Sequence, residues 1–427
     1  MSEETASPTA TSSRHVWRLA WPSILSYLLF TTVGFMHIKI VAGLGTTAVA
    51  AVTTGHRVFF LIQAVLMGMS VAATALIARN WGARDVRAAE RVAWTSLLAS
   101  LCLAALLSLP PLLFPVSIAS LFGLDADATE AAGSFIFWLG AFGLFAATNI
   151  ILSTALRATG DVITPLWFLF FSSLLNVFMA YALAFGLGPF PAMGVAGVGL
   201  GGGFAGAVIT SLFVAFWWRG RFALKPPVNR ALDWLTVRQL VSIGAPSMLE
   251  QGIVQLAFLV FFSIVARYGT DAYAAYGIGI SLVSFSIVIG FGFGIATATI
   301  VGQQLGAGRP EQAIAAGWRS MRMAVIAMSL LSVLLFVFAE DLAHFMINDP
   351  EVTGLTVVFI YMIALSQPLM ACEFTLGGAL LGSGGARFGV RGGLGGIVGG
   401  GLIGGGFASR GGGGGWWGCG GGGGGGG

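Results

Sequence analysis

The stretch LIARNWGARD (76–85) returns as IVGQQLGAGR (300–309), 224 residues further along the chain. The same offset, held without a gap over several predicted elements, pairs proline with proline and tryptophan with tryptophan: Pro22 with Pro246, and Trp94 with Trp318. Chance similarity between apolar helices explains paired glycines and alanines. It does not explain proline and tryptophan pairs in one register, so the sequence indicates an internal duplication.

The composition places the duplicated chain in a membrane. Of its 427 residues, 56% are hydrophobic and only 9% are charged, and the mean hydropathy is +0.89. Soluble domains carry about 25% charged residues. The formal net charge of +4 gives no sign of nucleic-acid binding, because the position of each charge matters more here than the sum. We therefore expect an all-α integral membrane protein.

Apolar runs of about 20 residues or more predict membrane-spanning helices. The predicted spans lie near 20–42, 48–78, 92–114, 133–156, 163–187, 194–218, 240–266, 273–302, 318–339 and 355–381. By the repeat, two further spans belong after residue 386. The sequence therefore predicts twelve spans in two six-helix lobes. Because six is even, both lobes enter the membrane from the same side, so their pseudo-twofold axis should run along the membrane normal.

Loop charges predict the orientation and the segments of the chain. Arginines and lysines follow the second, sixth and eighth spans, whereas the intervening loops are mostly acidic. The positive-inside rule then places the N-terminus and the central linker in the cytosol. The segments that we expect are a disordered cytosolic tail (1–15), an N-terminal lobe (16–218), a cytosolic linker (219–236) and a C-terminal lobe (237–427).

Residues 387–427 are dominated by glycine, although the repeat calls for two spans there. Each glycine costs a helix about 1 kcal/mol relative to alanine, so this segment suits a flexible linker better than a membrane span. We interpret the glycines as standing in place of other residues of the last two spans. An intact mass well away from the 44.2 kDa of the printed sequence is the expected result, and agreement with that mass contradicts the interpretation.

Several stretches resemble the multidrug and toxic compound extrusion (MATE) family, between about residue 16 and about residue 386. They are WPSILSYLL (21–29), GLGTTAVAAV (43–52), ARNWGARD (78–85), TALRATGD (154–161), GQQLGAGR (302–309) and GGALLGSGG (377–385). The resemblance implies an antiporter that expels organic, often cationic, compounds in exchange for H⁺ or Na⁺. The wider superfamily also contains lipid-linked oligosaccharide flippases, which are the first alternative. A channel or a non-transporting membrane receptor is the alternative from another class.

Three titratable residues inside predicted spans are candidates for ion coupling: Glu373, Glu250 and His37. Charged side chains are costly in hydrocarbon, so such residues are functional candidates by default. Glu373 has the neutral Asn149 as its repeat counterpart, and a purely structural hydrogen bond is its alternative role. Glu250 either takes part in coupling or snorkels to the cytosolic surface. His37 stands where the family usually has an aspartate, which leaves the role of that position open.

The candidate substrate-binding residues are polar or polarisable positions within the spans: Glu373, Gln251, Gln255, Asn149, Asn176 and Met36. Their carboxylate and amide groups suit an organic cation better than an anionic lipid-linked sugar. A flippase should instead line its cleft with cations, and Lys39 and Arg57 are the candidates for that role. His37 and Lys39 are two residues apart, so they should point to different faces of one helix.

No enzymatic constellation and no cofactor motif is evident. GLGGGFAG (199–206) has glycine spacing, but it lies within a predicted span without the following lysine of a nucleotide loop, so we expect no ATP binding. The coupling ion, H⁺ or Na⁺, takes the place of a cofactor, and Na⁺ is the metal ion that Glu373 or Glu250 could hold. We expect a monomer in the bacterial cytoplasmic membrane, with the lipid bilayer and small organic cations as its partners.

Overall fold

The computed structural model describes residues 13–228, 231–265, 270–346 and 350–384, with backbone only at 255–265, 270–282, 345–346 and 350–351. The regular structure described is helical throughout. The helices are α1 (Ser13–Ala42), α2 (Thr46–Gly82), α3 (Val86–Leu113), α4 (Pro115–Ser120), α5 (Ala126–Ala141), α6 (Gly143–Thr159), α7 (Ile163–Phe185), α8 (Gly194–Trp218), α9 (Trp234–Val265), α10 (Thr270–Gly306), α11 (Pro310–Val337), α12 (Ala339–Met346) and α13 (Pro350–Gly382).

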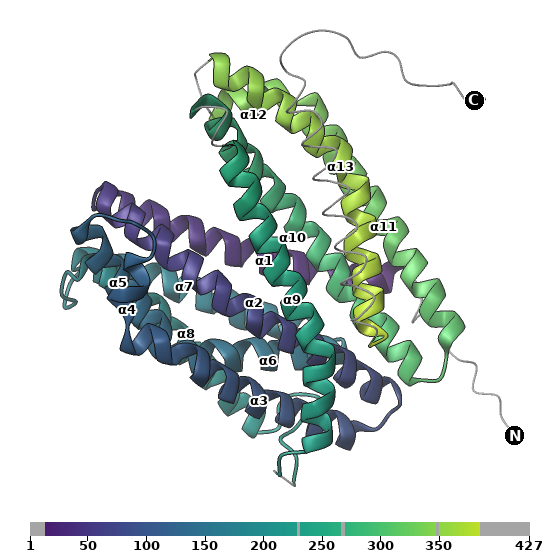
Figure 1. Cartoon of the computed structure of the whole chain (residues 1–427). Helices are drawn as coiled ribbons and strands as arrows, with labels where there is room; N and C mark the ends of the chain where they lie inside the picture. The colour runs from purple at the N-terminus through teal and green to yellow at the C-terminus, as the bar shows by residue number, and fades with distance from the viewer. Residues whose placement is uncertain (1–12, 229–230, 266–269, 347–349, 385–427) are drawn as a thin grey trace, which may run out of the picture.

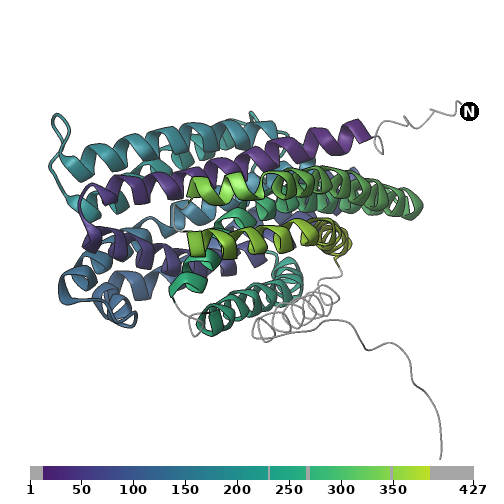
Figure 2. The ribbon, with the colours of Figure 1, turned by 90° about the horizontal axis from the view of Figure 1, so that it is seen from above.

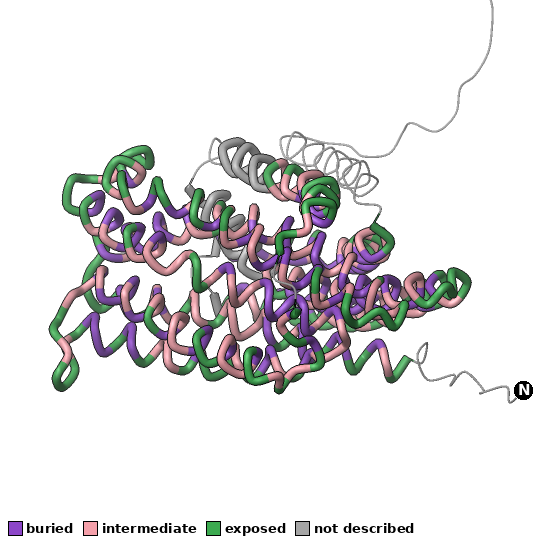
Figure 3. The backbone as a smooth tube through the Cα atoms, turned by 90° about the horizontal axis from the view of Figure 1, so that it is seen from below, coloured by how far each residue is buried: buried purple, intermediate pink, exposed green. Residues whose placement is uncertain are grey.

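The prediction of an all-α membrane fold is confirmed. Eight described helices are long and apolar enough to cross a bilayer, and α5 with α6 forms a ninth, bent span. Figure 3 shows exposed residues along the outer faces and at the helix ends, with buried residues concentrated where helices meet. Apolar side chains on an outer face are stable only against lipid tails, which is the arrangement expected of a membrane bundle.

Helix boundaries repeat with the offset that the sequence predicts. Adding 224 to the bounds of α2 and α3 gives the bounds of α10 and α11. The N-terminal lobe comprises α1 to α8, and the described part of the C-terminal lobe comprises α9 to α13. The last two predicted spans fall in 385–427, outside the described residues.

The two copies differ at one helix. In the N-terminal lobe the chain bends by 51° between α5 and α6, whereas the equivalent α13 is continuous over 33 residues. Gly140 and Gly143 flank the bend and pack against Pro111 and the hydroxyl group of Ser108 in α3. The offset places alanine and glutamine at the equivalent positions of α13, and both residues favour a helix more strongly than glycine does.

The two lobes converge at one end and diverge toward the other, as Figure 1 shows. They meet where α2 and α10 finish, which we call the closed end. A Cβ atom on Gly82 would overlap the backbone of Gln303, and a Cβ atom on Gly306 would overlap the backbone of Arg79. The offset relates Gly82 to Gly306 and Arg79 to Gln303. These two contacts are therefore copies of each other across the pseudo-twofold axis.

The same symmetry holds deeper in the interface. Gly68 of α2 packs on Gly244 and Met248 of α9, and Gly292 of α10 packs on their counterparts in α1, Ala20 and Ile24. Among the described residues, the ring contacts between the lobes reach the middle of α1, where Tyr27 stacks on Phe291 at 5.5 Å between ring centroids. Figure 2 shows the start of α1 running alongside the helices of the C-terminal lobe.

The segment between the lobes is anchored to the N-terminal lobe. The indole N–H of Trp217 donates to the carbonyl of Leu224 at 3.0 Å, and the backbone N–H of Lys225 donates to Oε1 of Glu90, also at 3.0 Å. Helix α9 begins at Trp234, within the segment that we expected as linker. Likewise, α1 begins at Ser13, within the expected tail, and residues 1–12 lie outside the described part of the chain.

Candidate functional site

Two carboxylates lie within helices of the C-terminal lobe. Glu250 lies at the midpoint of α9, and Glu373 lies nine residues before the end of α13, which is about 14 Å along the helix. Their charges are close enough to interact. Two carboxylates repel each other when both are ionised, so a bound proton or cation stabilises the pair. We refer to Glu250 and Glu373 as the carboxylate pair.

The position of Glu250 contradicts one interpretation of the sequence. A residue that snorkels to the cytosolic surface must lie near a helix end, whereas Glu250 is half-buried at mid-helix. The second observation concerns Glu373. Its side chain is exposed over the described part of the structure, so it is the more accessible member of the carboxylate pair.

A separate polar cluster lies within the N-terminal lobe. Nε2 of His37 in α1 is 2.6 Å from Oδ1 of Asn176 in α7. Nδ1 of His37 is 3.4 Å from Nε2 of His56 in α2, and the two imidazole rings stack with centroids 5.6 Å apart. His37 is buried, with 7% of its surface exposed. We refer to these three residues as the histidine cluster.

Hydrogen bonding in the histidine cluster specifies where its protons lie. The amide oxygen of Asn176 can only accept, so Nε2 of His37 donates to it. Nδ1 of neutral His37 is then an acceptor, and Nε2 of His56 donates to it. One additional proton would bind at Nδ1 of His56, because the other three ring nitrogens already donate or accept a hydrogen bond. Sequence reasoning did not select His56, although a second histidine within a predicted span was the available signal.

The remaining candidates for substrate binding are Asn149, Met36, Gln251 and Gln255. The amide Nδ2 of Asn149 donates to the hydroxyl oxygen of Thr210 at 3.4 Å, inside the N-terminal lobe. Met36 and Gln251 are half-buried. The side chain of Gln255 lies outside the described residues. Ser26, the repeat counterpart of Glu250, donates to its own helix at the carbonyl of Pro22, so the two lobes are chemically unequal here.

Two cationic side chains lie in the spans of the N-terminal lobe. Lys39 is exposed while His37 is buried, so the two residues do point to different faces of α1. Arg57 is exposed too, and it lies about three turns from Gly68 on the same face of α2. Because Gly68 contacts α9, this face is directed toward the C-terminal lobe.

The architecture has a known counterpart. The family model described as MatE matches residues 22–182 and 246–397, two segments that begin 224 residues apart. The chain belongs to the MATE family. The resemblance inferred from the loop motifs is thus confirmed, and the protein is a multi-pass membrane transporter of a multidrug efflux family. The channel and receptor alternatives are not supported by this match.

Curated relatives are similar to this chain over most of its length. A probable multidrug resistance protein NorM of Thermotoga maritima is 27% identical, over 86% of this chain and 79% of its own length. An FAD transporter of Shewanella oneidensis is 24% identical, over 81% of this chain and 76% of its own length.

Solved MATE structures share the fold. A structure described as the outward-facing conformation of a multidrug resistance MATE family transporter superposes with a TM-score of 0.82, at 22% identity. The match covers 89% of this chain and 84% of that one. The described part of this MATE chain thus has the fold of a solved MATE transporter.

Proposed function

We propose that this transporter is an antiporter that exports organic cations in exchange for H⁺ or Na⁺. The observation that carries the proposal is the carboxylate pair, two acidic side chains that lie within helices of one lobe, at the middle of α9 and in α13. Either coupling ion or an organic cation would relieve their mutual repulsion. The two ligands therefore compete for one site, as exchange requires.

The orientation is part of the proposal. The chain carries basic residues just after both helices that finish at the closed end, at Arg84 and Arg87 after α2 and at Arg309 after α10. The positive-inside rule makes that end cytosolic, in the bacterial cytoplasmic membrane and with the N-terminus inside. The lobes then touch on the cytosolic side, so this is an outward-facing state.

In the exchange cycle that we propose, the ionised carboxylate pair binds an organic cation when the cytosolic side is open. The lobes then close at the cytosolic end. H⁺ or Na⁺ entering from outside neutralises Glu373, and the organic cation leaves outward. The coupling can be no larger than the change in affinity caused by the ion, typically about 1–3 kcal/mol. One chain contains both lobes, so a monomer is sufficient, and no ATP or other cofactor takes part.

The histidine cluster is a second protonation site in this scheme. A proton taken up by either imidazole ring adds a positive charge to the cluster, while Nε2 of His37 donates to Asn176 in both states. This gives the N-terminal lobe a response to pH where the family usually has an aspartate. If Na⁺ is the only coupling ion, this cluster has a structural role instead.

Export of an organic anion is the second candidate function. Arg57 lies on the face of α2 that is directed toward the C-terminal lobe, and Lys39 is exposed in α1. One relative is named as an FAD transporter. A cleft in which these cations, rather than the carboxylate pair, bind the substrate would suit an anion or a lipid-linked sugar.

Transport in proteoliposomes tests the proposal. We expect ethidium, an organic cation, to be taken up when H⁺ or Na⁺ flows out of the proteoliposomes down its gradient. The pH gradient and the Na⁺ gradient are applied separately. A labelled nucleotide serves as the anionic probe. Ethidium movement driven by neither gradient contradicts antiport, and nucleotide transport without ethidium transport supports the anion candidate.

A further inference from the structure

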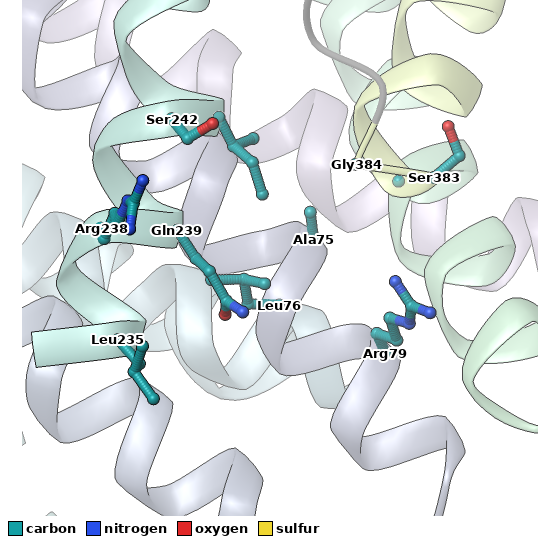
Figure 4. A pocket seen from close by; sticks show the side chains of 11 residues that line it. Ala75, Leu76, Arg79, Leu235, Arg238, Gln239, Ser242, Ser383 and Gly384 are labelled. Atoms are coloured by element: carbon teal, nitrogen blue, oxygen red, sulfur yellow. The ribbon is translucent and has the colours of Figure 1, made fainter. Parts of the chain in front are cut away.

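A groove of 460 Å³ opens between α2, α9 and α13 near the closed end (Figure 4). Sites for small ligands typically have about 300–1,000 Å³, so a ligand can be accommodated. Its lining comes from both lobes, with Arg79 from α2 on one side and Arg238 from α9 on the other. The groove is lined by residues near the beginning of α9 and near the end of α2. It therefore lies well away from the carboxylate pair, whose Glu250 is at the middle of α9.

The lining chemistry favours an anion. Arg79 and Arg238 are both exposed, and none of the eleven lining residues is acidic. Neither arginine forms an ion pair within the described ranges. Gln239 and Ser242 extend from α9 on the same side, and Ser383 lies at the end of α13 (Figure 4). These side chains add hydrogen-bond donors to two positive charges, and guanidinium groups match the oxygen geometry of a phosphate.

The equivalent place in the other half of the molecule keeps an arginine at Arg14, the counterpart of Arg238, but has none at the counterpart of Arg79. The repeat puts Gln303 where α2 has Arg79. The amide of Gln303 donates to the carbonyl of Ala158 at 2.8 Å, so that side chain is neutral and already hydrogen-bonded to the end of α6. The free guanidinium group of Arg79 is thus specific to the groove.

We propose that the groove binds a phosphate group, held between Arg79 and Arg238. Leu235 and Arg238 belong to the first turns of α9, so the groove lies at the depth of the membrane interface. Basic pockets between membrane helices on the cytosolic side suit the headgroups of anionic lipids. The phosphate comes either from an anionic phospholipid of that leaflet or from soluble phosphate.

A phosphate bound in the groove would join the two lobes. Arg79 belongs to the N-terminal lobe and Arg238 to the C-terminal lobe, so a ligand that binds both arginines requires the closed end to be together. Such a ligand stabilises this state relative to one in which the ends of α2 and α10 have separated. This consequence rests on the alternating access of the proposed function, whereas binding itself does not.

Binding to the purified full chain in detergent micelles tests the site. The probes are dioleoyl phosphatidylglycerol, dioleoyl phosphatidylcholine and inorganic phosphate, and the variants are Arg79→Gln, Arg238→Gln and the double variant. Each substitution should weaken phosphatidylglycerol binding about fivefold, and both together about 30-fold, at about 1 kcal/mol per arginine. Arg322→Gln, which removes an exposed arginine of α11 outside the groove, should bind as the wild type does. Arg79→Lys should recover part of the affinity, which separates loss of charge from misfolding.

The probes also identify the source of the phosphate. Arginine-dependent binding of phosphatidylglycerol that inorganic phosphate does not displace supports a lipid site. Arginine-dependent binding of inorganic phosphate alone supports a site for soluble phosphate. The proposal is overturned if the folded double variant binds every probe as tightly as the wild type. The distance between α3 and α11, measured with and without the bound probe, reports whether binding stabilises the closed end. If the probe binds but this distance does not change, the proposed stabilisation of the closed end is wrong and the binding site stands. Both conclusions are independent of the antiport experiment.

Discussion

Replacing Gly82 or Gly306 with alanine should abolish most transport by keeping the two lobes apart at the closed end. In each case the new Cβ atom would overlap a backbone carbonyl of the opposite lobe, at Gln303 or Arg79. Backbone atoms cannot rotate aside as a side chain can. Overpacking of this kind costs about 1–3 kcal/mol, which shifts the equilibrium between the lobes by about 5- to 150-fold at each site. The double variant should show the larger effect.

Spin labels can follow this change directly. Arg87 in α3 and Glu311 in α11 are both exposed, and the repeat makes them equivalent, so labels there report the separation of the lobes. We expect a longer distance in Gly82→Ala and Gly306→Ala than in the wild type. Gly206→Ala is the matched control, because a Cβ atom there meets nothing within 4 Å. Distances and transport equal to those of the control would show that the contact is not essential for closure.

Replacing Glu373 with glutamine should eliminate gradient-driven export while the protein remains folded and inserted. Glutamine keeps the size of the side chain and removes its ability to bind a proton, to carry charge and to hold Na⁺. Glu250→Gln should have a smaller effect, because Glu250 is half-buried while Glu373 is exposed. Loss of a coupling free energy of about 1–3 kcal/mol corresponds to about 5- to 150-fold in the exchange ratio.

Ethidium export from proteoliposomes, with the pH and Na⁺ gradients imposed separately, measures this loss. Glu340→Gln, which removes an exposed carboxylate of α12, should export as the wild type does. Export by Glu373→Gln at the wild-type rate, with the wild-type response to both gradients, would show that this carboxylate is structural.

The sequence predicted the helices and the relation between the lobes well. Hydropathy locates the spans because an apolar segment in a membrane must satisfy its backbone hydrogen bonds internally, which an α-helix does. The 224-residue offset then identifies equivalent helices, and the paired contacts of Gly82 and Gly306 repeat it in space. The bend between α5 and α6 was not predicted. It depends on Gly140 and Gly143 packing against α3, a contact that hydropathy does not reveal.

The sites were predicted less completely. Glu250 and Glu373 were each visible as an acidic residue within a span, but how near they lie to each other depends on how α9 and α13 are arranged within the C-terminal lobe. Likewise, His37 and Asn176 are 139 residues apart in the chain and 2.6 Å apart in the structure. His56 joins them from α2, and a single-residue argument had no means of pairing it with His37. The groove at Arg79 and Arg238 needs residues from three helices, so the sequence alone gave no sign of it.

The central claim is that the coupling ion and the exported cation compete for the carboxylate pair. Equilibrium binding of ethidium to the purified transporter, over a range of H⁺ and Na⁺ concentrations, tests that claim most directly. We predict that the apparent Kd of the wild type rises in proportion to the concentration of one of these ions, and that Glu373→Gln shows no such rise. An apparent Kd of the wild type that is independent of both ions would contradict the account.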